Sequence, residues 1–100
     1  MTHRVKVKLD RNHHQIVEAL QNAGYAVQSL AAVGHGCPDL LVCSESGDLF
    51  LLEIKWPGAH LTDDQAEWEM VWPGQMYVVH TPEEALAACA YRDALKTMKG

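Results

Sequence analysis

The 100-residue sequence has no apolar run that approaches the ~20 residues needed to span a bilayer, so we expect no transmembrane helix and no membrane partner. Its first residues, MTHRVKVKLDR, lack the apolar stretch of a signal peptide. Cysteine is scarce: Cys37, Cys43 and Cys89 are widely spaced and form no CxxC pair, which gives no indication of a zinc site or a disulfide framework. These absences favour a cytoplasmic protein with reduced, mostly buried thiols.

Basic residues are also few, since 8 Lys and Arg stand against 13 Asp and Glu, for a formal net charge of -5. This balance argues against a protein that holds nucleic acid by bulk attraction, because phosphate contacts are made by Lys and Arg. The amino-terminal segment of about residues 1–9 is nonetheless basic. With the residues next to it, it carries Arg4, Lys6, Lys8 and Arg11. Charge alone leaves two interpretations open, a solvated and partly disordered arm or an arm that binds phosphate.

What the sequence does contain is enough for one small domain, which we expect to span residues 1–100, because 48% of the residues are hydrophobic and can bury a core. Glycine and proline divide the chain into short segments with helical or strand periodicity. The predicted elements are, in order, a helix over 10–23, strands over 25–30, 39–43 and 49–54, a helix over 61–72, a strand over 75–79 and a helix over 81–98. The order α-β-β-β-α-β-α predicts an α/β fold with a mixed four-stranded sheet flanked by helices.

Charged residues stand at the ends of two neighbouring predicted strands. Asp39 begins the second strand, while Glu53 and Lys55 close the third and share one face of it, because side chains alternate along a strand. Hairpin partners lie ~5 Å apart, so Asp39 and Glu53 could bridge one divalent cation, with the carbonyl oxygen of Ile54 as a third ligand. A cation would also relieve the repulsion between two poorly solvated carboxylates. With Lys55 beside a metal-activated water, the chemistry indicated is phosphodiester hydrolysis.

The stretches GHGCPDLLV, LLEIK and LTDDQAEW resemble the PD-(D/E)XK nucleases, specifically the small stand-alone virus-type replication-repair nuclease (VRR-NUC) domains of phage or prophage type. The resemblance covers nearly the whole chain. It implies a restriction-endonuclease-like core in a bacterial or phage-infected cell, a Mg²⁺ or Mn²⁺ cofactor, and a homodimer that cleaves branched DNA such as four-way junctions. By residue, it implies Asp39, Glu53 and the Ile54 carbonyl as metal ligands, Lys55 as base or charge stabiliser, and Gln65 as an active-site support.

The first predicted helix departs from this pattern. Related domains usually carry an acidic residue there that points at the metal, and counting back from Gly24 places the equivalent position near Asn12. On a helical wheel Asn12 falls on the apolar stripe and Glu18 on the far side, so Asn12 is expected to face inward and Glu18 outward. Asn12 is then a possible support that adds no charge, and tight binding of a second metal is in doubt. Asp10 could compensate, although a helix-cap role is favoured for it.

Several residues have a structural interpretation beside a functional one. Gln65 lies three residues after Thr62, as in a capping box, so a cap role and a site role are equally favoured. The turn residues Gly34, His35 and Gly36 could also admit a DNA backbone. Trp56 could stack on a DNA base, whereas core or dimer packing is favoured for Trp68 and Trp72.

Two functions therefore remain. The first is a metal-dependent DNA endonuclease, for which the constellation at positions 39, 53 and 55 is the evidence. The second is a catalytically weak module that keeps the nuclease fold and binds DNA or a partner protein, for which the missing helix-one acid is the evidence. A strand-end ion pair could account for Glu53 and Lys55 alone, but it explains neither Asp39 nor the glycines before it.

Overall fold

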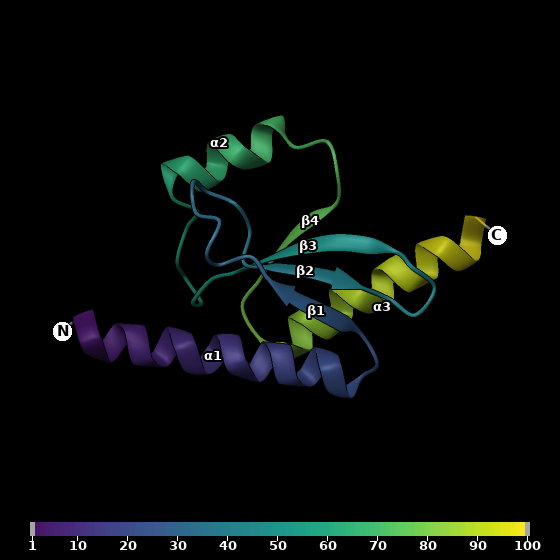
Figure 1. Cartoon of the computed structure of the whole chain (residues 1–100), viewed down its shortest axis with the longest axis horizontal. Coiled ribbons are helices and arrows are strands. Elements are labelled where there is room, and N and C mark those ends of the chain that lie inside the picture. Colours follow the sequence, from purple (N-terminus) through teal and green to yellow (C-terminus); the bar gives the residue numbers. More distant parts are fainter. Residues whose placement is uncertain (1, 100) are drawn as a thin grey trace.

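The computed structural model describes the backbone of residues 2–99 and the side chains of residues 11–98. Its elements are α1 (Thr2–Asn22), β1 (Ala26–Ser29), β2 (Leu40–Cys43), β3 (Leu49–Ile54), α2 (Asp63–Val71), β4 (Met76–Val79) and α3 (Pro82–Lys99). The predicted order of elements is confirmed, and β3 covers the predicted range of 49–54 (Figure 1). Within residues 2–99, every helix is too short or too polar to cross a membrane.

The four strands form one mixed sheet in the order β1-β2-β3-β4. The first three strands are antiparallel neighbours, as short polar turns between them allow, whereas β4 runs parallel to β3. A parallel neighbour requires a crossover connection. The segment that contains α2 supplies it, and this segment leaves the sheet where Glu53 and Lys55 lie (Figure 1).

The core lies on one face of this sheet. Alternate residues of β2 and β3 point to that face, where α1 and α3 cover them (Figure 1). Its main members are Ile16 and Leu20 from α1, Leu40, Val42, Phe50, Leu52, Ile54 and Val79 from the strands, and Ala85 and Cys89 from α3. The α2 helix lies over the other face and has no buried residue. Glu53 points to that other face, where the covering layer is the lightly packed α2 segment.

The first helix begins at Thr2, well before the predicted start at residue 10. The added residues include several Lys and Arg, which propagate a helix well, and no Gly or Pro interrupts them. Asp10 consequently lies inside α1 and is not its amino-terminal cap, which corrects the role favoured for it. The side chains of residues 2–10 lie outside the described part, so the DNA contacts predicted for Arg4, Lys6 and Lys8 stay predictions.

The cysteines are free thiols, but only Cys89 is buried, and Cys37 and Cys43 are half-buried. The expectation that most are buried is therefore wrong in part. Burial and the neighbouring charges of Glu53 and Asp39 raise the pKa of the Cys37 thiol, and burial raises the pKa of Cys89 to about 11. Both therefore favour the neutral thiol over the thiolate that a metal would require.

A tight turn before Asp39 docks against the start of α2. Gly34, His35 and Gly36 all have left-handed φ angles, of 70°, 56° and 82°, and the Cys37 N–H donates to the Gly34 carbonyl at 3.1 Å. A Cβ atom on Gly36 would stand 2.3 Å from the backbone oxygen of Asp64, whereas one on Gly34 would meet nothing within 4 Å. The predicted turn is confirmed, and at Gly36 the neighbouring space is filled by the α2 backbone.

Replacing Gly36 by Ala should therefore destabilise the protein more than replacing Gly34 by Ala. Both substitutions place a side chain at a left-handed φ, which costs about 1–2 kcal/mol. Gly36→Ala additionally forces α2 away from the turn, and overpacking of this kind typically costs a further ~1–3 kcal/mol. Urea unfolding of the two variants measures the difference, and equal losses of unfolding free energy would contradict the close approach.

Candidate active site

Asp39 and Glu53 meet where β2 begins and β3 ends. The pairing of Leu40 with Leu52 brings the residue before β2 next to the last residues of β3. The Ile54 N–H donates to the Asp39 carboxylate at 2.7 Å, which fixes one Asp39 oxygen against the β3 backbone. Glu53 is only 2% exposed, although it is a carboxylate. The predicted proximity of Asp39, Glu53 and Ile54 is therefore present in the fold.

Gln65 contacts this cluster from α2 and caps its own helix as well. Its side-chain oxygen accepts from the Thr62 N–H at 2.9 Å, and its backbone N–H donates to the Thr62 hydroxyl at 3.2 Å, which completes a capping box. The remaining amide nitrogen donates to Glu53 Oε2 at 2.7 Å. The sequence left the cap and the site as alternatives, but one side chain does both because its two ends point in different directions.

The charge of Glu53 is only partly compensated. Lys55 Nζ lies 3.9 Å from Glu53 Oε2, and the Lys55 side chain is 14% exposed. Glu53 Oε1 is buried and has no hydrogen-bond partner among the described residues. Burial, followed by the neighbouring Asp39 charge, raises the pKa of Glu53 to about 7, although Lys55 acts in the opposite direction. The site thus holds an ionisable oxygen that is cut off from water and lacks a partner.

This arrangement fits a hard divalent cation. An unpartnered buried carboxylate oxygen beside a second carboxylate is what Mg²⁺ or Mn²⁺ would satisfy, and Mg²⁺ is commonly held by one or two carboxylates together with water and substrate oxygens. Asp39 and Glu53 would hold the ion, and the Ile54 carbonyl remains the predicted third oxygen. Across residues 11–98, no group of three or more His, Cys, Asp or Glu side chains could hold a metal. A site with few protein ligands agrees with the absence of an acid at position 12.

Asn12 takes the orientation that the helical wheel predicts. It is 9% exposed, and its amide donates to the His80 carbonyl at 3.1 Å, at the end of β4. Glu18 is exposed and pairs with His14 at 3.4 Å on the outer side of α1. Asn12 therefore ties α1 to the strand end beside the site and brings no charge to it.

The aromatic residues near the site differ in exposure. Trp56, which follows Lys55, is 44% exposed and lines a pocket with Arg11, Asn12 and Gln15. Trp68 and Trp72 stack with ring centroids 4.6 Å apart, and neither is buried in the core. Sequence reasoning missed Gln15, and it also missed His80, which bonds Glu84 at 2.8 Å. The one available signal for Gln15 was its place one helical turn from Arg11.

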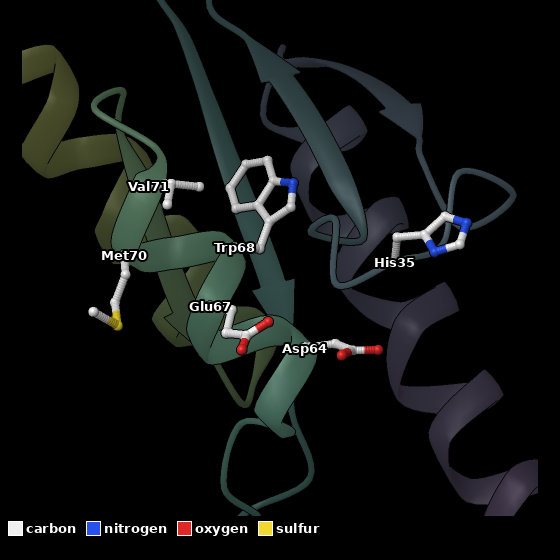
Figure 2. A pocket seen from close by; sticks show the side chains of 6 residues that line it. All are labelled: His35, Asp64, Glu67, Trp68, Met70 and Val71. Carbon is white, nitrogen blue, oxygen red and sulfur yellow. The ribbon is translucent and has the colours of Figure 1, made fainter.

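A larger hollow is lined by residues of α2 and by His35. It has a volume of about 520 Å³ and lies between α2 and the turn that carries His35. Figure 2 shows His35 across from Met70 and Val71, with Asp64 and Glu67 on the helix between them. A phosphate at His35 would thus approach two carboxylates. The contacts predicted for Gly34, His35 and Gly36 with DNA stay predictions.

Comparison with known proteins gives one strong structural likeness. No protein-family model matches the sequence, and no curated protein does. A solved structure described as a VRR_NUC domain superposes with a TM-score of 0.70 at 22% identity, covering 83% of this chain and 95% of that chain. The resemblance inferred from the sequence motifs is therefore confirmed at the level of the fold.

Replacing Glu53 by Gln should stabilise the metal-free protein at alkaline pH. Folding raises the Glu53 pKa from 4.5 to about 7, so the folded protein binds this proton more tightly than the unfolded chain does. The stabilisation is complete below pH 4.5 and is lost as the pH rises through 7, a change of up to about 3 kcal/mol. Gln cannot ionise, so the variant escapes this loss.

Urea unfolding in EDTA at pH 5 and pH 8 measures the effect. The advantage of Glu53→Gln over the wild-type protein should grow between the two values. Glu18→Gln, which changes an exposed carboxylate, should show little growth. A parallel pH dependence for wild type and Glu53→Gln would be incompatible with the burial argument.

Proposed function

We propose that this chain, which has the fold of a VRR_NUC domain, is a divalent-metal-dependent DNA endonuclease that hydrolyses phosphodiester bonds. The observation that carries the proposal is the unpartnered oxygen of Glu53, buried beside Asp39 and within 3.9 Å of the Lys55 amine on its other oxygen. A strand-end ion pair without a function would not require a buried carboxylate, Glu53, beside a second, half-buried one, Asp39. Branched or structured DNA, such as four-way junctions, is the proposed substrate.

Each residue of the cluster has a separate role in the proposed hydrolysis. A bound Mg²⁺ or Mn²⁺ supplies Lewis-acid polarisation of the phosphoryl group and acidifies a water. Gln65 holds the Glu53 carboxylate in place through a 2.7 Å hydrogen bond, and the Ile54 N–H does the same for Asp39. Lys55 positions the attacking water or stabilises the charge that develops on the phosphate. Water loses a proton to solvent as it attacks the phosphorus in line, the bond from phosphorus to the 3′ oxygen breaks, and that oxygen takes up a proton from solvent, so the products are a 3′-hydroxyl and a 5′-phosphate.

A homodimer suits both the proposed branched DNA substrate and the exposed apolar surface of α2. A body of 100 residues offers little area for a branched DNA, while a two-fold assembly can act on two strands symmetrically. On α2, Met70 is 85% exposed and Val71 79% exposed, and contiguous exposed apolar surface commonly marks an interface. We propose that α2 contributes to the dimer contact.

The alternative is a catalytically weak module that keeps the fold and binds DNA or a partner protein. Asn12 in place of an acid favours it, because the described residues then provide only two carboxylate ligands. This alternative predicts binding of DNA or of a partner protein without metal binding. Calorimetry with Mn²⁺ separates the two: the nuclease should bind Mn²⁺, and Asp39→Asn should not.

Cleavage should require Asp39 and Lys55. In the presence of Mn²⁺, the wild-type protein should cleave one or more of single-stranded, duplex, flap and four-way DNA. Asp39→Asn and Lys55→Ala should each reduce the rate on the order of 100-fold or more, since each removes a group that stabilises the transition state. Gel analysis of labelled DNA measures the rates.

Matched controls are available for both variants. Glu18→Gln removes an exposed carboxylate from α1, and Lys96→Ala removes an exposed amine whose bond is to the Ser46 carbonyl. Both should cleave at the wild-type rate. Cleavage that persists in Asp39→Asn and Lys55→Ala would reveal a contaminating nuclease and would remove the support for the proposal.

The dimer should depend on the exposed face of α2. Met70→Lys places a charge in the proposed contact and should shift the protein toward monomer in sedimentation equilibrium. Met98→Lys is a matched control, because Met98 on α3 is 82% exposed against 85% for Met70. A wild-type protein that sediments as a monomer, or equal behaviour of the two variants, would rule out this contact.

A further inference from the structure

A small pocket adjoins the catalytic cluster on the α1 side. Trp56 follows Lys55 in the chain, so its loop leaves directly from the cluster. The Lys55 N–H donates to the Val79 carbonyl at 2.9 Å, and the next residue, His80, accepts from the Asn12 amide at 3.1 Å. These two bonds hold α1 beside the point where the Trp56 loop begins. Between α1 and this loop is a pocket of about 240 Å³, which is lined by Arg11, Asn12, Gln15 and Trp56.

The chemistry of this pocket differs from that of two acidic hollows in the described part of the protein. The hollow beside His35 is lined by Asp64 and Glu67. Another, beside Tyr25, is lined by Glu45 and Asp93. The pocket at Trp56 instead presents a guanidinium, two side-chain amides and an indole, and no carboxylate of residues 11–98 lines it. In a protein of formal charge -5, the described lining of this pocket offers a polyanion one cation, Arg11, and no negative charge.

Trp56 provides the most specific surface in the pocket. Its side chain is 44% exposed, and it does not belong to the hydrophobic core. An exposed indole is a platform on which any base can stack, and Arg beside it can contact the phosphate backbone. The pocket is smaller than the ~300–1,000 Å³ of sites for drug-sized ligands, so its size suits one ring system.

We propose that this pocket binds one unpaired base of the DNA strand being cleaved, stacked on Trp56, with Arg11 on the adjacent phosphate and Gln15 available to the base edge. The inference rests on the proposed nuclease function and deepens it. A fully paired duplex keeps its bases in the stack and cannot fill the pocket without the cost of unstacking. A nucleotide that is already unpaired, as at a junction or flap, avoids that cost. The pocket therefore gives the enzyme its preference for branched DNA.

The test compares two labelled duplexes of the same sequence, one fully paired and one with a single unpaired nucleotide that carries a fluorescent adenine analogue. Binding is measured by anisotropy in EDTA, so that no cleavage occurs. The wild-type protein should bind the unpaired site more tightly and quench the analogue by stacking. Trp56→Ala should lose this preference by a factor on the order of ten, as expected for one lost stacking contact, and should abolish the quenching. Trp56→Tyr retains an aromatic ring and should keep most of both.

Tyr91→Ala is the matched control, since Tyr91 is a 54% exposed aromatic on α3. It should keep the full preference, and circular dichroism should show each variant folded. If Trp56→Ala prefers the unpaired site as strongly as the wild type while Mn²⁺-dependent cleavage persists, this inference is overturned and the nuclease function stands. A wild-type protein that neither binds DNA nor cleaves it overturns both.

Discussion

A carboxylate buried at the end of β3 beside a second carboxylate is the constraint on which the functional end of this protein depends. Glu53 is 2% exposed, one of its oxygens has no hydrogen-bond partner in the described part of the chain, and its pKa is raised to about 7. Such a group lowers the stability of a small domain at neutral pH. The surrounding fold compensates only in part, through Gln65 and Lys55, and leaves the free oxygen beside Asp39. The β2–β3 hairpin, the crossover from β3 to β4 and the start of α2 all meet at this pair.

The elements that converge on the pair come from opposite sides of the sheet. The core face, covered by α1 and α3, provides rigidity, because β3 is buried there along most of its length. The other face provides access. There the turn at Gly36 packs against the first residues of α2, and that contact sets the position of Gln65 relative to Asp39. The two carboxylates thus lie on the rigid sheet, and Gln65, which contacts Glu53, lies on a lightly packed helix.

Much of this was predictable from the sequence. The order of elements followed from glycine, proline and apolar periodicity, and the pairing of Asp39 with Glu53 followed from a short turn between two strands of known alternation. The start of α1 did not follow, because alternating Val and Lys at residues 5–8 lack helical periodicity even though Lys continues a helix well. The sequence did not predict that Gln65 has both roles at once. Local spacing indicates a cap but gives no information about a contact twelve residues away. The pocket at Trp56 depends on α1 and the loop after β3 meeting in space, which no local pattern encodes.

Because Gln65 closes the capping box of α2 and also donates a hydrogen bond to Glu53, the first turn of α2 positions the carboxylate of the candidate site. That helix has no buried residue, so it can open locally at a far smaller free-energy cost than unfolding of the core requires. Fraying of a single turn would then release the glutamate while the sheet stays intact. The arrangement of Glu53 and the global fold can therefore be lost in separate equilibria, and amide hydrogen exchange at the start of α2 reports on the first of them.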